Sequence, residues 1–185
     1  NNIEVDVNTE LSSSELQEKI KNYDALVVRS ATKVTKEIIE AGDKLKIIGR
    51  AGAGVDNIDL VAAKKKNIIV MNTPGGNTNA TAEHTISLLL SLYRSIPKAN
   101  TSTHQGLWKK KNFKGLELKG KKIGLIGFGN VAKRVTEIAK GFDMEVFVFS
   151  KSFESRKDNF SNIKSLPLDE ILSFCDIISF HCKSP

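Results

Sequence analysis

Residues 122–132 of the chain read KIGLIGFGNVA. The run Lys122–Ile126 predicts a buried strand, and the pattern G-x-G-x-x-A that follows it opens a predicted helix. In this pattern Gly127 permits a tight turn, Gly129 lets backbone amides approach a pyrophosphate, and Ala132 is small enough for helix and strand to pack closely. The start of the helix favours an anion. The alternative is a glycine-rich turn used only for packing, but its place between a strand and a helix favours a dinucleotide site.

Predicted strands and helices alternate on both sides of this motif. Strands are predicted at 3–7, 25–28, 45–48, 68–71, 122–126, 145–149 and 176–180, and helices at 12–21, 35–41, 60–66, 80–98, 131–140 and from 167 onward. This alternation is typical of α/β proteins with parallel sheets. The turn-forming residues 72–77, NTPGGN, separate two such regions, 1–73 and 74–185.

The composition of the 185 residues is that of a globular protein, with 40% hydrophobic and 26% charged residues. No apolar run approaches the roughly 20 residues of a membrane span, so no membrane partner is expected. Cys175 and Cys182 are too few for a disulfide framework, so we expect a reducing, cytoplasmic compartment. Together with His181 these cysteines lack the spacing of a metal site, and no metal is expected.

The basic excess is concentrated in one segment. Seven lysines and one acidic residue, Glu117, lie between Lys109 and Lys122. Such a cluster could bind a polyanion. Of the 28 basic residues, however, only five are Arg, and nucleic-acid recognition usually relies on Arg and on interleaved aromatic residues. We therefore favour a solvated loop and expect no nucleic-acid partner.

Two of the few arginines follow apolar strands. Arg29 and Arg50 are predicted at the carboxyl ends of their strands, where open α/β sheets bind ligands. The planar guanidinium suits a carboxylate or phosphate, and Ser30 with the amides of Ala51–Gly54 could complete an anion site. The alternative for Arg29 is a surface ion pair. The alternative for Arg50 is an ion pair with a nearby carboxylate, Asp56 or Asp59.

The second strand after the glycine motif ends at Ser150. Dinucleotide-binding folds that prefer NAD usually place Asp or Glu here, about 20 residues after the glycines, to hold the adenosine ribose hydroxyls. Ser150 can still hydrogen-bond a ribose. Without the carboxylate a 2′-phosphate is not repelled, and Lys151 or Arg156 could attract it. NAD and NADP both stay open on the residues alone.

Several stretches resemble the D-isomer-specific 2-hydroxyacid dehydrogenase family. They are VVRSATKV at 27–34, GRAGAGVDN at 49–57, VMNTP at 70–74, the segment from GLW at 106–108 to Gly120 and Lys121, and the glycine motif. These stretches run in the family's order along nearly the whole chain. The resemblance implies a partial flavodoxin-like α/β substrate domain over 1–73, followed by the first half of a Rossmann-like doubly wound parallel sheet that binds NAD(P) over 74–185.

The resemblance also implies site residues and an assembly. It places a substrate anion site at Arg29, Ser30, Arg50, Ala51, Gly52 and Asn77. It places cofactor contacts at Gly127, Gly129, Asn130, Val131, Ser150 and Cys182, the last standing where Thr is commoner. It implies a homodimer or higher homo-oligomer built around the helix after Pro74 and the loop carrying Trp108.

The activity implied by the resemblance is hydride transfer between the nicotinamide of NAD, or NADP given Ser150, and C2 of a small 2-hydroxy acid. The segments around Arg29 and Arg50 point to a phosphorylated hydroxy acid. In this family an Arg holds the substrate and a His–Glu pair moves the proton, and we expect all three beyond Pro185 in a longer chain. The alternatives are a glyoxylate or hydroxypyruvate reductase and a non-catalytic dinucleotide-sensing protein on the same fold.

Overall fold

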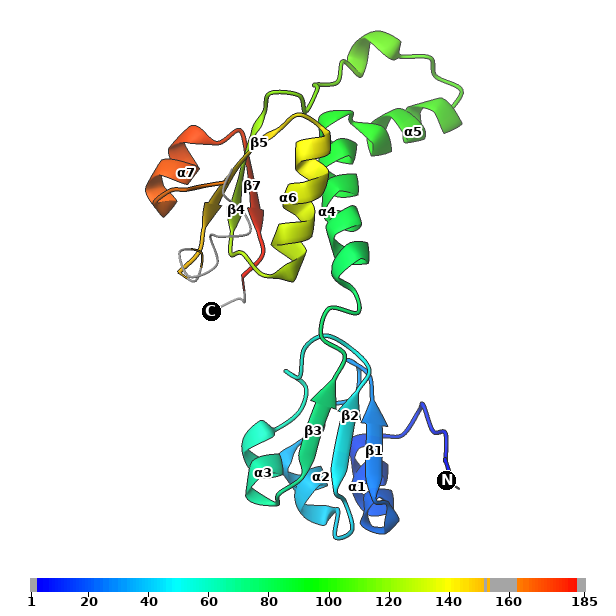
Figure 1. Cartoon of the computed structure of the whole chain (residues 1–185). Coiled ribbons are helices and arrows are strands. Elements are labelled where there is room, and N and C mark those ends of the chain that lie inside the picture. The colour runs from blue at the N-terminus through cyan, green and yellow to red at the C-terminus, as the bar shows by residue number, and fades with distance from the viewer. Residues whose placement is uncertain (1–2, 152, 154–162, 183–185) are drawn as a thin grey trace. The chain divides into compact units, whose positions relative to one another are not determined.

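The computed structural model describes residues 3–151, 153 and 163–182. Contacts divide the chain into two compact units, residues 1–77 and 78–185. Each unit has a parallel sheet with helices packed on it, so the α/β prediction is confirmed (Figure 1). Across the described ranges, no helix combines the length and apolar character that a bilayer crossing requires. Which unit binds substrate and which binds cofactor stays a prediction.

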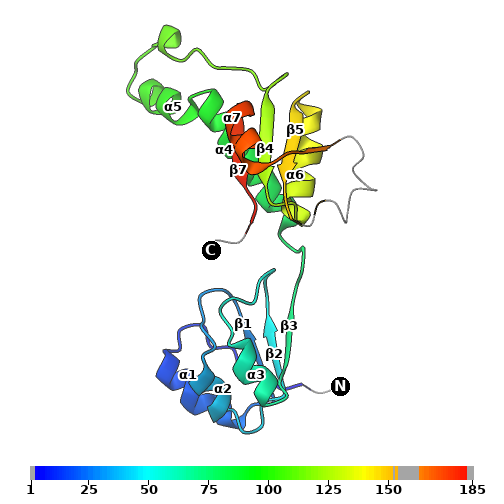
Figure 2. The ribbon, with the colours of Figure 1, turned by 90° about the vertical axis from the view of Figure 1, so that its left-hand side faces the viewer.

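The first unit has a three-stranded parallel sheet in the order β1-β2-β3, with strands Ala25–Val28, Ile47–Arg50 and Ile69–Asn72. Helices α1 (Ser13–Lys19), α2 (Lys36–Ala41) and α3 (Leu60–Lys65) lie on one face of it, and a short 3₁₀ turn, Ile20–Asn22, follows α1 (Figure 2). The predicted capping box starts α1: the Glu15 amide donates to the Ser12 hydroxyl, and the Ser12 amide donates to the Glu15 carboxylate.

The core of this unit lies between the sheet and its helices. Val28 and Ile48 from the strands pack with Ile38 and Ile39 of α2, and all four are buried. The opposite side of the sheet bears Val27, Ile69 and Met71, which are 76%, 59% and 51% exposed. No element covers this bare face within the part of the chain that the structure describes.

The predicted strand at 3–7 is wrong. Residues 3–8 have no regular secondary structure, and Ile3, Val5 and Val7 are exposed. A cavity of about 240 Å³ is lined by this segment together with α1 and the edge strand β1. A strand needs hydrogen bonds to a neighbouring backbone, and residues 3–8 form none with any described residue.

The second unit has four parallel strands in the order β6-β5-β4-β7. Its strands are β4 (Lys122–Ile126), β5 (Glu145–Phe149), β6 (Lys164–Ser165) and β7 (Ile177–Phe180). Its helices are α4 (Thr78–Tyr93), α5 (Ile96–His104), α6 (Asn130–Gly141) and α7 (Leu168–Phe174), with a 3₁₀ turn at Lys110–Asn112. Counted in chain order the strands run 3-2-1-4, the arrangement of the first half of a Rossmann sheet with one strand of the second.

Helices cover both faces of this sheet. Helices α4 and α6 pack on one face, where Ile86 and Val135 join Leu125 in the larger core. Helix α7 packs on the other face, where Ile171 meets Phe147 (Figure 1). The predicted doubly wound fold is therefore confirmed for this unit.

The single helix predicted over 80–98 is two helices. Helix α4 ends at Tyr93, Ser95 adopts a left-handed conformation with φ 51°, and α5 begins at Ile96. Pro97 explains the break, since it lacks an N–H and its ring would clash with the carbonyl four residues earlier, that of Tyr93. The two helices consequently run in different directions (Figure 1).

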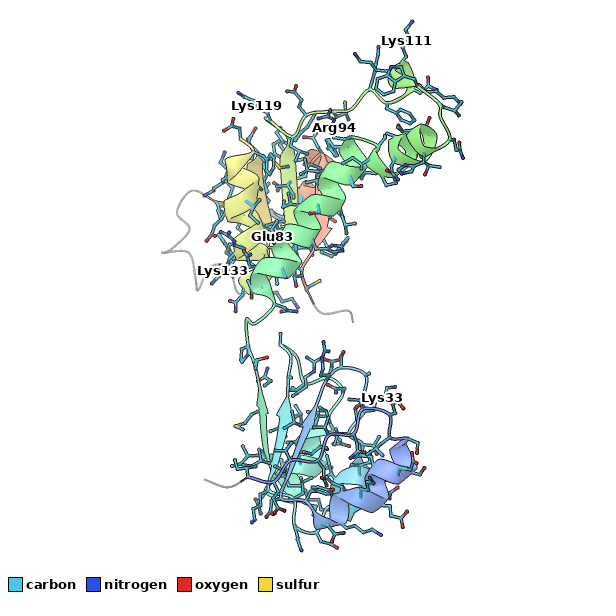
Figure 3. All side chains as sticks on the ribbon, turned by 90° about the vertical axis from the view of Figure 1, so that its right-hand side faces the viewer. Lys33, Glu83, Arg94, Lys111, Lys119 and Lys133 are labelled. Atoms are coloured by element: carbon cyan, nitrogen blue, oxygen red, sulfur yellow. The ribbon has the colours of Figure 1, made fainter. Side chains whose placement is uncertain are left out.

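Residues 96–117, which we call the arm, extend from the second unit, and Lys111 lies near the arm's far end (Figure 3). The lysines of the arm are exposed, as the solvated-loop interpretation predicts. The other three lysines of the 109–122 cluster, which follow the arm, have partners. Lys119 and Lys121 pair with Asp143 and Asp176 at 3.7 and 3.9 Å, and Lys122 lies over the Phe174 ring.

Candidate functional site

The carboxyl edge of the first sheet gathers the predicted substrate residues. In the parallel register Val28 pairs with Arg50 and Arg50 with Asn72, so the three strands end at one level. Arg29 directly follows β1. Strand β2 ends at Arg50, two residues later than the strand predicted over 45–48. The register thus brings Arg29, Arg50 and Asn72 to the same edge, as expected for a ligand site.

Arg50 is directed at its own loop. Its Nη1 donates to the Gly54 carbonyl at 2.7 Å, and a Cβ on Gly52 would lie 2.7 Å from the same atom. The guanidinium therefore lies against Gly52, and a side chain at this position would displace it. Among the residues the structure describes, Arg50 forms no ion pair, and Asp59 instead caps α3 by accepting from the Ala62 amide at 2.9 Å.

The Ala51–Gly54 loop is tied to both neighbouring strands. The Ala51 amide donates to Val28 and the Thr73 amide to Gly52, at 2.9 and 3.0 Å. The Asn72 side chain donates to the Ala53 carbonyl at 2.7 Å. The Ala51 and Gly52 amides are thus engaged within the fold, while those of Ala53 and Gly54 donate to no group in the described ranges. Of the Ala51–Gly54 amides that the sequence suggested, only those of Ala53 and Gly54 are therefore free donors within the described ranges.

The remaining predicted substrate residues are open to a ligand. Arg29 and Ser30 are exposed in the turn after β1, and Arg29 forms no ion pair with any described residue. Asn77 is exposed in the turn before α4. Sequence reasoning did not single out Asn57, which lies inside the quoted GRAGAGVDN stretch and contacts the turn that carries Arg29 and Ser30. Its Nδ2 donates to two carbonyls of the turn after β1, those of Arg29 and Thr32, at 3.0 and 2.7 Å.

The glycine motif of the second unit turns the chain from β4 into α6. Gly127 has φ 96°, a left-handed conformation that favours glycine. A Cβ at Gly127 would lie 2.8 Å from the carbonyl carbon and oxygen of His181 and 2.9 Å from the Cys182 nitrogen. The motif is therefore pressed against the end of β7, on the side where the strand order reverses. In open α/β sheets this switch point is the ligand site.

The geometry of this turn fits a dinucleotide. Gly129 is the residue before α6, has no capping side chain, and a Cβ added to it would meet nothing within 4 Å. The space in front of the helix is thus open at the position where a backbone must approach a phosphate. Asn130 and Val131 begin the 12-residue helix, and their amides belong to its free first turn. Ala132 is fully buried against the sheet.

The predicted ribose position lies at the end of the neighbouring strand. Ser150 directly follows β5 and is partly buried, and its carbonyl accepts from the Phe153 amide at 3.1 Å. Phe153 is fully buried and packs edge-on against Phe128 of the glycine motif. Lys151 is exposed. Arg156, the other cation named from the sequence, lies outside the described residues.

The end of β7 carries a histidine and a cysteine. The His181 amide donates to the Ile126 carbonyl at 2.8 Å, which extends the pairing with β4. Its Nε2 lies 2.9 Å from the Ser179 hydroxyl, and burial lowers the pKa of His181 below its usual value. Cys182 is an exposed free thiol. In the described part of the chain no three His, Cys, Asp or Glu residues form a group that could hold a metal.

A parallel 3-2-1-4 sheet with an open glycine turn at its switch point defines the class of Rossmann-type, dinucleotide-binding folds. Comparison with known proteins narrows this class. The family model described as D-isomer specific 2-hydroxyacid dehydrogenase, catalytic domain, matches residues 1–175. The chain belongs to this family.

Curated relatives agree with the family. D-3-phosphoglycerate dehydrogenases of Archaeoglobus fulgidus and Homo sapiens are 44% and 42% identical to the chain over 181 and 171 residues. These matches cover 98% and 92% of the chain but only 34% and 32% of the relatives. The chain thus spans about one third of their length.

The chain is similar to one solved structure that contains NAD+ and to another that contains NADPH. NAD+-bound 3-phosphoglycerate dehydrogenase of Entamoeba histolytica matches with TM-score 0.73 and 37% identity, over 95% of this chain and 52% of that one. An acyclic imino acid reductase solved with NADPH and D-Arg matches with TM-score 0.83 and 32% identity, over 95% and 56%. Both similarities extend across both units of the chain.

Proposed function

We propose that the full-length protein is a D-3-phosphoglycerate dehydrogenase, which oxidises 3-phospho-D-glycerate to 3-phosphohydroxypyruvate, the first step of serine biosynthesis. The observation that carries the proposal is the 42–44% identity, over 92–98% of the chain, to curated enzymes of that name. The arginine-bearing edge of the first sheet supports it, because the substrate carries a carboxylate and a phosphate. The chain spans about one third of the length of these relatives. We therefore propose the activity for the full-length protein.

In this proposal the first unit binds the anionic substrate. The exposed Arg29 guanidinium and Ser30 hydroxyl supply a charged and a neutral donor. The amides of Ala53 and Gly54 add uncommitted donors beside them. Arg50, which donates to Gly54, keeps the loop in shape and adds positive charge behind it. Together these groups would hold the substrate with its C2 hydrogen in a fixed direction.

The second unit binds the cofactor in this proposal. The Gly127–Val131 turn holds the pyrophosphate, and Ser150 reaches the adenosine ribose. When bound, the nicotinamide accepts a hydride from substrate C2. As the C2–H bond breaks, the C2 hydroxyl loses its proton to a base and a carbonyl forms, a step that suits a base with a pKa near neutrality. We assign the role of that base to the His–Glu pair, which the resemblance, like the substrate-holding Arg, leads us to expect beyond Pro185.

The test is an assay of the full-length protein. Absorbance of the reduced nicotinamide is followed with 3-phosphoglycerate at alkaline pH, with NAD and NADP in parallel. Turnover with either cofactor supports the proposal. Turnover only with glycerate or glyoxylate-type substrates would replace it with another 2-hydroxyacid dehydrogenase. Binding of NADH without any turnover would favour a dinucleotide-sensing protein.

We further propose that the protein uses NAD and also accepts NADP, because Ser150 replaces the carboxylate that repels a 2′-phosphate. We expect Ser150→Asp to raise the KM for NADP by about tenfold or more, since two like charges then meet at the ribose, and to leave the KM for NAD equal or lower. Steady-state kinetics of the full-length protein measure both constants. Ser173→Asp makes the same change on the exposed side of α7 and serves as the control. Unchanged NADP kinetics in Ser150→Asp would contradict this role.

The proposed assembly is a cytoplasmic homodimer that buries the arm and the outer side of α4. Large apolar side chains are exposed there: Trp108 is 84% exposed and Leu92 is 75% exposed. Leu88, Ile96 and Leu116 add to the same elements. Apolar patches of this kind mark protein–protein interfaces.

A further inference from the structure

Asn57 joins two loops that sequence places far apart. Its amide nitrogen donates to Arg29 O and Thr32 O, 28 and 25 residues away, at 3.0 and 2.7 Å. These carbonyls lie at the two ends of the turn that carries Arg29 and Ser30. Within the described ranges, Asn57 is the only side chain that hydrogen-bonds to this turn. One amide group thus clamps both ends of it.

The backbone around Asn57 is held in place by hydrogen bonds of its own. The Val34 amide donates to Asn57 O at 2.8 Å and the Asp59 amide donates to Val34 O at 3.0 Å. Val34 and Ile58, which form an isolated parallel bridge, are both buried. This ladder fixes the chain just after the turn, but it does not reach Arg29 or Ser30, which depend on the side chain of Asn57.

The same pair of loops holds two buried polar atoms without a partner. Among the described residues these atoms are Arg50 Nε and Asn57 Oδ1. Each carries a desolvation cost that no hydrogen bond offsets. Groups of this kind call for a reason other than stability, and a ligand site is one such reason.

We propose that Asn57 is a positioning residue for the substrate anion site: its side chain holds the Arg29–Thr32 turn in the conformation that presents Arg29 and Ser30. The proposal rests on the proposed function for the identity of the substrate. Without the clamp, the turn must be ordered at the moment of binding, and the free energy of that ordering is subtracted from the affinity. The loss falls on substrate binding and not on the cofactor, whose residues lie in the other unit.

The test compares Asn57→Ala with Lys66→Met in the full-length protein. Lys66 Nζ donates to the carbonyls of Ile39, Glu40 and Gly42 at 3.0–3.1 Å, so its loss destabilises the same unit without touching the turn. For Asn57→Ala we expect about a tenfold rise in the KM for 3-phosphoglycerate, with kcat and the KM for the nucleotide within about threefold. Should Asn57→Ala fail to fold, Asn57→Gln keeps the amide donor on a longer side chain and gives a smaller change in the same direction.

A second readout needs no activity. Trypsin cleaves after Arg29, and a released turn should be cut about tenfold faster in Asn57→Ala than in Lys66→Met, as measured by mass spectrometry of the fragments. Equal cleavage rates, or an unchanged KM for the substrate, would overturn the proposal. Faster cleavage in a protein that shows no turnover with 3-phosphoglycerate would refute the proposed activity but not the hold of Asn57 on the turn.

Discussion

Gly127 is a residue at which the second unit tolerates little change. Its φ of 96° is costly for any side chain, and the backbone of His181 and Cys182 lies within 2.9 Å of where a Cβ would be. Backbone cannot move aside as the end of a flexible side chain can. The glycine therefore serves two purposes: it turns the chain toward α6 and it lets β7 approach the turn.

We expect Gly127→Ala to lower the free energy of unfolding by about 2–4 kcal/mol, from the left-handed backbone together with the clash. Gly141 is the matched control, because a Cβ there meets nothing within 4 Å and the residue ends α6. Gly141→Ala should leave stability equal or raise it slightly. Urea unfolding of the full-length variants measures both. Equal stabilities would show that β7 can shift away from the turn.

His181 should make the protein more sensitive to acid. Burial lowers the pKa of His181 in the folded state below the value of 6.5 of an exposed histidine. The unfolded chain therefore binds its proton first, and the contribution of this residue to stability falls as the pH drops below about 6.5. At about pH 8 and above both states are essentially neutral and the effect vanishes.

Thermal unfolding between pH 8 and pH 5 measures this effect. We expect the Tm of His181→Gln to fall less over this range than that of the wild type, because glutamine does not titrate. His104, exposed on α5, supplies the control: His104→Gln should follow the wild type. Parallel curves for His181→Gln and the wild type would contradict the assignment.

At the scale of elements, the break between α4 and α5 requires an unfavourable backbone conformation at Ser95. Ser95 holds a left-handed conformation without being glycine, and Ser95 caps nothing with its side chain. We expect Ser95→Gly to raise the free energy of unfolding by about 1 kcal/mol, because glycine adopts this conformation freely. Ser91→Gly, inside α4, should instead lower it by a similar amount. Differential scanning calorimetry tests the pair, and a destabilising Ser95→Gly would contradict it.

The elements that the sequence predicted well are those whose signals are local. The capping box at Ser12 and the strand–glycine–helix motif at Lys122–Ala132 each carry their structure within a few residues. The segment 3–7 has the same apolar alternation, yet a strand there depends on a neighbouring backbone that the sequence cannot indicate. In the helix predicted over 80–98 the apolar period outweighed Pro97, which was the available sign of the break.

The site followed the same division. Arg29 and Arg50 could be placed at a ligand edge because strand ends are visible in the sequence. The orientation of Arg50 toward Gly54 and the engagement of the Ala51 amide could not, since both depend on how one loop folds over the next strand. Asn57 was visible only as part of a motif, because its partners are backbone carbonyls, which every residue has.

At the scale of the whole molecule, substitution of an exposed apolar side chain of α4 tests the proposed dimer. We expect Leu92→Asp to weaken dimerisation of the full-length protein by at least tenfold, because a carboxylate would be buried in an apolar contact. Sedimentation velocity over a range of concentrations measures the dissociation constant. Leu172→Asp alters an equally apolar, exposed residue on α7 and is the control. A dimer unaffected by Leu92→Asp would place the interface elsewhere.

The bare face of the first sheet should make the 185-residue polypeptide prone to associate with itself and with apolar surfaces. Val27, Ile69 and Met71 form an exposed apolar surface on this sheet. Dyes such as ANS should bind to it with enhanced fluorescence. Such a surface attracts itself, so the polypeptide should show a negative second virial coefficient despite its net charge of +7. It should foam, adhere to plastic and leave solution at low ammonium sulfate, since sulfate strengthens apolar association.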